Sequence, residues 1–143
     1  LEGFQAGLSW ECVLNKQEAF RRAFDDFDWD KVAAYDEARQ AALYADPGII
    51  RNRRKIAAAV GNAAAFAAIR QEFGSFDSYL WQWTDGKTLV ECGPTTSPLS
   101  DAISKDLKKR GMKFVGSTII YAYLQAVGVL YAHEPGCFLE AAP

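Results

Sequence analysis

The chain has 143 residues, half of them hydrophobic, and a net charge of −2. These values suit one folded domain and argue against a disordered chain or a simple polycation that coats nucleic acid. No uninterrupted apolar run is long enough to cross a bilayer, and no signal peptide is visible. Three cysteines without framework spacing argue against a disulfide scaffold, so we expect a reducing cytoplasm. The chain starts at Leu1 rather than Met, so we expect the natural protein to continue upstream.

The opening segment, Leu1 to Trp10, has helical spacing and carries a carboxylate and an indole eight positions apart. On one continuous helix, Glu2 and Trp10 would lie about 12 Å apart along the axis and about 80° apart around it. One flat molecule could then touch both, stacking on the indole and bonding its edge to the carboxylate, as an aromatic base would. In the alternative interpretation, Trp10 belongs to the core and Glu2 is a solvated carboxylate at a helix start.

The next part of the chain predicts helices joined by short loops. Apolar residues at helical spacing run from Leu8 to Phe27, and Asp30 is a candidate N-cap for the helix that follows. Another helix is expected through Leu43. An alanine-rich stretch from Arg53 to Phe73 predicts one long helix, which Gly74 ends.

The stretch from Phe76 to Trp83 is short and rich in aromatic residues. We predict a core helix there, with a strand as the alternative, because short apolar runs are ambiguous. Residues Lys87 to Pro98 predict an irregular connection. The fold class is therefore all-α, and residues 1–143 read as a single helical domain.

Residues of about 101–128 predict a helix-hairpin-helix. A helix capped by Ser100 or Asp101 leads into a glycine-bracketed hairpin, and an apolar helix starts after it. Free backbone N–H groups at that second helix start, surrounded by basic side chains, suit DNA phosphates. The predicted DNA-binding residues are Lys108, Lys109, Arg110, Gly111, Lys113, Gly116 and Ser117. An ordinary αα-hairpin with a solvated basic face is the alternative.

A second basic run, from Gly48 to Lys55, opens the alanine-rich helix. Basic residues at a helix N-terminus interact unfavourably with the helix dipole and lower the stability of the helix. Their presence in spite of this cost indicates a functional role. We therefore predict that Arg51 and Arg53 also contact DNA phosphate, with a solvated helix start as the alternative.

A pair of potential metal ligands, His133 and Cys137, stands near the C-terminus with three residues between them. Both can ligate one zinc ion when two more ligands are supplied. From these residues alone, a surface histidine and a cysteine without metal are the alternative.

Four motifs occur in one order and nearly span the chain: LEGFQAGLSW from Leu1, GIIRNRRKI from Gly48, LKKRGMKFVGSTIIYAYLQAVG from Leu107 and HEPGC from His133. This set resembles the 3-methyladenine DNA glycosylase I family, constitutive bacterial alkylation-repair enzymes of the helix-hairpin-helix glycosylase superfamily. The stretch from Arg70 to Pro98 matches that family poorly.

The resemblance implies an all-helical enzyme that hydrolyses the N-glycosidic bond of 3-methyladenine flipped out of double-stranded DNA. It implies that Glu2 is the catalytic and base-binding carboxylate and that Trp10 walls the pocket. His133 and Cys137 would be two of four ligands of a structural zinc. The family's other two zinc ligands, and aromatic residues that stack on the base, lie upstream of its LEG motif, so this chain would be N-terminally truncated.

No lysine is convincingly placed as a nucleophile, so we predict a monofunctional glycosylase without lyase activity. We expect it to act as a monomer, and we expect no membrane among its partners. Two other functions stay open. A non-catalytic helix-hairpin-helix module would bind duplex DNA with strong salt dependence and no lesion preference. A helical interaction domain would instead present its aromatic surface to a protein partner.

Overall fold

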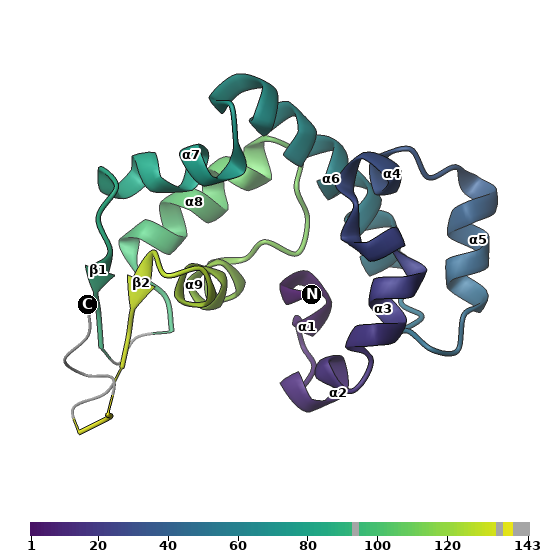
Figure 1. Cartoon of the computed structure of the whole chain (residues 1–143), viewed down its shortest axis with the longest axis horizontal. Coiled ribbons are helices and arrows are strands. Elements are labelled where there is room, and N and C mark those ends of the chain that lie inside the picture. Colours follow the sequence, from purple (N-terminus) through teal and green to yellow (C-terminus); the bar gives the residue numbers. More distant parts are fainter. Residues whose placement is uncertain (93–94, 134–135, 139–143) are drawn as a thin grey trace.

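The computed structural model describes residues 1–92, 95–133 and 136–138. Figure 1 shows two helical halves with a long helix, α6, between them. The helical elements are α1 (Glu2–Gln5), α2 (Trp10–Leu14), α3 (Gln17–Ala23), η1 (Asp25–Phe27), α4 (Trp29–Ala33), α5 (Glu37–Ala45), α6 (Arg53–Phe73), α7 (Phe76–Trp81), η2 (Gln82–Thr84), α8 (Pro98–Lys109) and α9 (Ser117–Ala126). The predicted all-α class is confirmed, apart from one short pair of strands.

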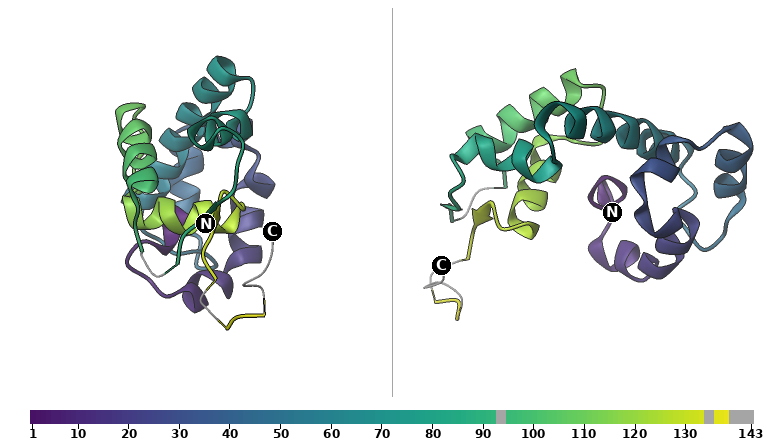
Figure 2. Two further views of the ribbon diagram at one scale, coloured as in Figure 1. Left: turned by 90° about the vertical axis from the view of Figure 1, so that its left-hand side faces the viewer. Right: turned by 45° about the horizontal axis from the view of Figure 1, so that its top comes forward.

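The long helix α6 runs from Arg53 to Phe73, as predicted. Alanine favours the helix, and both ends are capped. The Asn52 side chain accepts a hydrogen bond from the backbone N–H of Lys55, and Gly74 follows the helix with a φ of 82°. The helix packs against α4 and α5 in one half and α7 in the other, which Figure 2 shows from two further sides. Among the described residues no helix, α6 included, is both long and apolar enough to cross a membrane.

Each half has its own apolar core, and α6 contributes to both. Ile56, near the start of α6, packs with the buried Phe20 and Leu43 of the first half. Ile69, near its end, belongs to the core of the second half. That second core also contains Tyr79, Leu80, Ile103, Leu107, Ile120 and Leu124. Any site between the halves is therefore held by α6.

The opening segment is not the continuous helix we expected. The helix α1 ends at Gln5, and α2 begins at Trp10 with Ser9 as its N-cap. Between them Ala6 has an extended ψ of 114° and Gly7 has a φ of 76°, which breaks the helix. The separation of about 80° predicted for Glu2 and Trp10 on one helix is therefore wrong.

Two predicted helix starts are also displaced. The carboxylate of Asp28, not of Asp30, caps α4 by accepting two backbone N–H bonds. Ser97 caps α8 in a reciprocal capping box with Ser100, so neither Ser100 nor Asp101 is the N-cap. Several capping residues stand close together at both places, and sequence spacing does not choose among them.

The irregular connection predicted for Lys87 to Pro98 contains a strand, β1 (Leu89–Val90), while residues 93–94 lie outside the described part. It pairs in parallel with β2 (Leu130–Tyr131). Two residues are too few to show the alternation that predicts a strand, so the sequence carried no signal for this pairing. The helix predicted over Phe76 to Trp83 is confirmed as α7 followed by η2.

Candidate active site

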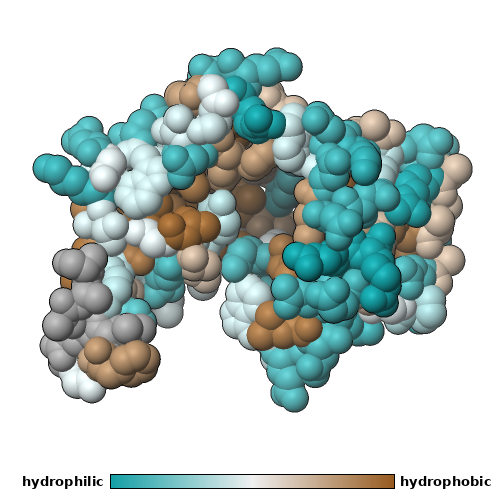
Figure 3. Space-filling view, viewed as in Figure 1, coloured by the Kyte–Doolittle hydropathy of each residue, from teal (hydrophilic) through white to brown (hydrophobic). Residues whose placement is uncertain are grey.

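A cavity of about 380 Å³ opens between the two halves. Figure 3 shows a hollow with an apolar floor there. Its size is within the range of about 300–1,000 Å³ typical of small-molecule sites. The aromatic side chains that line it are Phe4, Phe24, Phe27, Trp29, Phe66, Phe76, Phe114 and Tyr123. The polar residues that line it include Glu2, Lys55, Asn62 and Lys113.

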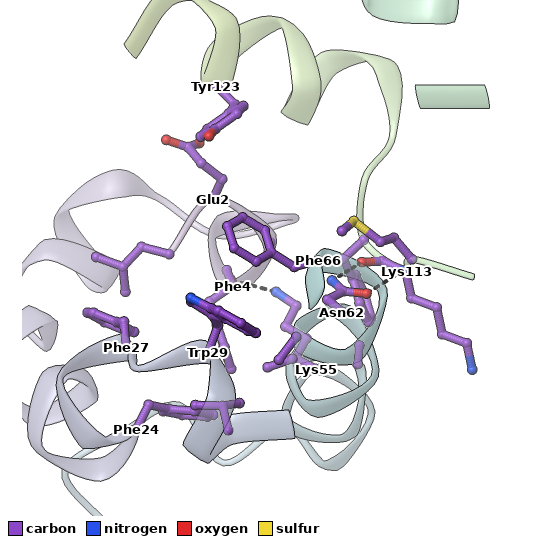
Figure 4. Close-up of a pocket in the computed structure, with 18 of the residues that line it drawn as sticks. Glu2, Phe4, Phe24, Phe27, Trp29, Lys55, Asn62, Phe66, Lys113 and Tyr123 are labelled. Atoms are coloured by element: carbon purple, nitrogen blue, oxygen red, sulfur yellow. Dashed lines mark hydrogen bonds between the residues drawn. The ribbon is translucent and has the colours of Figure 1, made fainter. Parts of the chain in front are cut away.

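Glu2 supplies the carboxylate of this cavity. Its Oε2 atom is buried and makes no hydrogen bond within the described structure, and burial raises the pKa of the carboxyl group. Figure 4 shows Glu2 beside Tyr123, whose pKa is raised by burial and then by the charge of Glu2. Leaving a buried acceptor unpaired costs about 1–3 kcal/mol or more. The group is therefore placed for a ligand that donates a hydrogen bond or carries positive charge.

Aromatic contacts fix one wall of the cavity. The ring centroids of Trp29 and Phe66 are 5.7 Å apart, and those of Phe66 and Phe76 are 4.7 Å apart with nearly parallel planes. The Arg70 guanidinium carbon lies 4.6 Å from the centroid of the Trp29 ring. Because neighbours hold each ring, a flat aromatic ligand meets preformed faces and orders few side chains.

A left-handed turn brings Phe27 to the cavity. Asp25, Asp26 and Phe27 have φ values of 50°, 57° and 60°, a conformation that strains residues other than glycine. The Asp25 carboxylate accepts hydrogen bonds from the Tyr35 hydroxyl and the Arg39 guanidinium. The Tyr35 bond is the main cause of the lowered pKa of Asp25. These contacts hold the strained turn.

Trp10 does not reach this cavity. Its side chain is 38% exposed, and it is not one of the described residues that line the cavity. The reason is the break at Ala6 and Gly7, which redirects the chain after α1. The structure thus brings Glu2 to the site and leaves Trp10 at the surface.

A basic groove adjoins the cavity. It encloses about 610 Å³ and is lined by the cations of Arg54 from α6, Lys108 from α8 and Lys113 from the segment between α8 and α9. Gly116 also lines it and is the N-cap of α9, where no side chain caps the helix. The first backbone N–H groups of α9 are therefore suited to bind an anion. Lys113 lines the cavity and the groove alike.

The predicted phosphate-binding residues separate into two sets. Those that line the groove, or start α9 beside it, are Lys108, Lys113, Gly116 and Ser117. Those that do not line it are Arg51, Arg53, Lys109, Arg110 and Gly111. The guanidinium of Arg53 instead lies 5.1 Å from the ring centroid of Tyr44. Arg54, which sequence reasoning passed over, is the α6 cation that lines the groove.

Arg110, which the sequence predicted as a phosphate-binding residue, is paired with acidic side chains of the protein itself. Its Nε donates to Asp106 at 2.6 Å, and its terminal nitrogens donate to Glu72 at 2.6 and 3.2 Å. Its guanidinium carbon lies 5.1 and 5.4 Å from the ring centroids of Phe73 and Tyr79. The hydrogen bonds from Arg110 lower the pKa of Glu72. This arginine ties α8 to the end of α6.

Replacing Arg110 with Met should therefore lower stability. The change removes the Arg110 hydrogen bonds to Glu72 and leaves Asp106 with the Tyr79 hydroxyl alone, and we expect a loss of about 1–2 kcal/mol, or about 3–6 °C in Tm. Thermal denaturation followed by circular dichroism measures the change. Lys109→Met removes the same charge from an exposed neighbour and should shift Tm by less than about 1 °C. Equal shifts in the two variants would contradict the structural role of Arg110.

His133 and Cys137 lie together near the end of the described chain. The Cys137 Sγ is 3.5 Å from the His133 Nδ1. Two such ligands of a tetrahedral zinc ion would lie ~3.5 Å apart, given bonds of about 2.0 Å to nitrogen and about 2.3 Å to sulfur. The pair fits two positions of a zinc site. No group of three or more His, Cys, Asp or Glu within residues 1–92, 95–133 and 136–138 is arranged to hold a metal ion.

Sequence reasoning missed most of the cavity. Lys55, Asn62 and Phe66 follow one another on α6 at intervals of seven and four, which places them on one face. Two polar residues inside an alanine-rich stretch are a signal that could have found this face. Trp29 and Tyr123 carry no such signal, because aromatic residues at helical spacing are equally typical of a core.

A family model described as methyladenine glycosylase matches residues 1–140 of the chain. DNA-3-methyladenine glycosylase 1 of Escherichia coli (strain K12) is 48% identical over 144 residues, covering 96% of this chain and 76% of the relative. A crystal structure of 3-methyladenine DNA glycosylase I matches with a TM-score of 0.90 at 44% identity, over 99% of this chain and 80% of that one. A variant of 3-methyladenine DNA glycosylase I in complex with 3-methyladenine matches with a TM-score of 0.90 at 35% identity. The match covers 95% of this chain and 76% of that one.

Proposed function

Because the chain belongs to the methyladenine glycosylase family, we propose that it is a DNA-repair enzyme that hydrolyses the N-glycosidic bond of 3-methyladenine in alkylated DNA. The damaged base is flipped out of double-stranded DNA into the cavity beside Glu2. The relative whose structure contains 3-methyladenine supports this choice of ligand.

One observation carries the proposal: the unpartnered carboxylate oxygen of Glu2 in an aromatic cavity. Methylation at N3 gives the adenine ring a positive charge. A fixed carboxylate therefore favours the lesion over neutral adenine by charge complementarity. The ring faces of Trp29 and Phe66 add stacking and cation–π attraction. The cavity thus selects a charged, flat base.

The lesion is already a good leaving group, so no acid has to protonate it. The bond between the base and C1′ of the sugar breaks, and its electron pair leaves with the base and neutralises it. Positive charge then develops on the sugar, and water adds at C1′ and gives up a proton. Within this proposal the Glu2 carboxylate attracts the positive charge on the base before the step, and its negative charge favours the positive charge that develops on the sugar.

The lysines of the cavity support attack by water rather than by an amine. Lys55 donates hydrogen bonds to the carbonyls of Phe4 and Ala6, which occupy its ammonium group. In Figure 4 the side chain of Lys113 points away from the cavity. A covalent lysine intermediate needs a free amine at the sugar. The proposed enzyme is therefore a monofunctional glycosylase.

We infer that α8, residues 110–116 and α9 form a helix-hairpin-helix that holds the DNA backbone. The basic groove and the uncapped start of α9 support this inference. The groove and the cavity share Lys113 and Phe114, so a strand held in the groove passes next to the cavity. Both belong to one chain, which supports a monomeric enzyme.

The cysteines support a reducing compartment. Cys12, Cys92 and Cys137 are free thiols, as is usual in the cytoplasm, where disulfides are rare. Within this proposal the enzyme works in the bacterial cytoplasm, and Cys137 stays available as a metal ligand.

Release of free base from alkylated duplex DNA tests the proposed function. We expect the protein to release 3-methyladenine, to release no adenine from undamaged DNA, and to leave abasic strands intact until alkali is added. Duplex binding without base release and without lesion preference would overturn the proposal in favour of a non-catalytic DNA-binding module. Strand cleavage coupled to base release would contradict the monofunctional assignment.

We further propose that His133 and Cys137 are two of the four ligands of a structural zinc ion. A bound zinc would cross-link the chain, and it supplies no chemistry to the reaction. Cys137→Ser should lower the zinc content measured by elemental analysis and lower Tm by roughly 5 °C. Cys12→Ser, which removes another thiol, should change neither quantity. Equal zinc content in the two variants would exclude Cys137 as a ligand.

A further inference from the structure

Lys55 is a buried cation at the point where α1, α6 and the segment between α8 and α9 meet. Only 6% of the residue is exposed. Its Nζ donates to the carbonyl oxygen of Phe4 at 2.7 Å and also to that of Ala6. The same Nζ lies 5.8 Å from the ring centroid of Phe114. Burying an ammonium group is costly unless it is hydrogen-bonded, so these contacts account for its position.

The helix α1 depends on such outside support. It is a single turn, Glu2–Gln5, far shorter than a helix that forms alone in water, and no side chain caps its start. Its last carbonyls have no partners within the helix. The Lys55 ammonium satisfies the carbonyls of Phe4 and Ala6 at this end, where the helix dipole favours a cation. Lys55 thereby fixes where α1 ends.

We propose that Lys55 is a positioning residue for Glu2, holding α1 so that the Glu2 carboxylate points into the cavity. This inference rests on the proposed function, in which that carboxylate binds the cationic base. Glu2 and Phe4 share the single turn of α1, so a shift of the turn moves the carboxylate. Lys55 acts through the backbone and does not touch the base.

The face of α6 that carries Lys55 also fixes the hairpin segment. Asn62, two turns further along, donates to the carbonyl of Lys113 and accepts from its backbone N–H, both at 2.8 Å; Figure 4 shows these bonds and the contact of Lys55 with Phe4. A Cβ added at Gly3 would lie 3.6 Å from the carbonyl oxygen of Phe114, so α1 packs directly on the hairpin. One face of α6 thus fixes the position of the Glu2 carboxylate relative to the proposed DNA-binding segment.

Lys55→Met, Lys55→Arg and the control Lys87→Met test the proposal. Lys87 is exposed in the turn after η2 and lines neither hollow. Each variant is assayed at a temperature where circular dichroism shows it folded. The measurements are single-turnover release of 3-methyladenine, binding of free 3-methyladenine, and binding of undamaged duplex. For Lys55→Met we expect release about 100-fold slower and free-base binding about tenfold weaker, with duplex affinity within about twofold.

Lys55→Arg, which keeps a cation with several donors, should recover most of the release rate, and Lys87→Met should match the parent protein. A folded Lys55→Met variant with the parental rate and parental base affinity would overturn the proposal. A loss of duplex affinity in Lys55→Met as large as its loss of free-base affinity would also overturn the proposal. If Lys55→Met does not fold, Lys55→Gln, which keeps an NH2 donor group, replaces it; loss of folding in both variants would overturn the proposal and show a purely structural lysine. Absence of base release by the parent protein would instead refute the proposed function itself.

Discussion

Glu2→Gln should slow the release of 3-methyladenine by on the order of 100-fold without lowering the stability of the fold. The substitution keeps the shape of the side chain and removes the charge that faces the cationic base. It also removes the negative charge from a carboxylate whose Oε2 atom is buried without a hydrogen bond, so Tm should stay the same or rise by a degree or two. Base release from alkylated duplex and thermal denaturation measure the two effects. Glu11→Gln on α2 removes an exposed carboxylate and is the matched control.

The pH dependence follows from the same group. Burial raises the pKa of Glu2, so the carboxylate takes up a proton at a higher pH than an exposed glutamate, whose pKa is about 4.3. The protonated acid no longer attracts the cation, and excision should fall in one step as the pH drops through the raised pKa. Above that pKa the buried charge disfavours folding, which agrees with the expected Tm of Glu2→Gln. A rate profile of that variant with the same acid step would exclude Glu2 as the titrating group.

Neutralising the groove should weaken DNA binding strongly. In a triple variant with Arg54, Lys108 and Lys113 each replaced by Gln, we expect affinity for undamaged duplex to fall by about 10- to 100-fold at low salt. Each lost phosphate contact lowers the slope of log affinity against log salt concentration by about 0.9, so the slope should become shallower by roughly 2.7. Fluorescence anisotropy over a salt series measures both quantities.

A second triple variant is the matched control, with Arg51, Arg53 and Lys109 replaced by Gln. It makes the same change in net charge. Its three residues were predicted from the sequence to bind phosphate, but they do not line the groove. Its salt slope should change by less than about one. If the second variant lost as much slope as the first, overall charge rather than the groove would govern binding.

The long helices were predictable because their signals are local. Alanine content and the caps at Asn52 and Gly74 define α6 without help from the rest of the molecule. The helices α8 and α9 follow from amphipathic spacing and the glycines between them. Glu2 was singled out by its spacing from Trp10 on an assumed continuous helix, which is wrong at Gly7, and the resemblance of the LEG motif to a known family supplied its expected role.

The cavity was not predictable because distant segments build it. Trp29, Phe66 and Tyr123 come from three helices, and nothing local marks them as facing one space. The basic cluster shows the same limit. Arg110 differs from Lys108 because Asp106 and Glu72, the latter 38 residues away, both pair with it in the fold. Charge counting along a chain cannot separate a cation that is internally paired from one that is free to bind a ligand.

The sharing of α6 between two cores has a consequence for how this protein can change over generations. Ile56 anchors the helix in one core and Ile69 in the other, so a substitution that tilts α6 moves both walls of the cavity together. Substitutions tolerated on the outer helices would be harmful on α6 unless a second substitution restored the packing of α6 in both cores. Divergence among descendants of this enzyme should therefore proceed through compensating pairs that span α6.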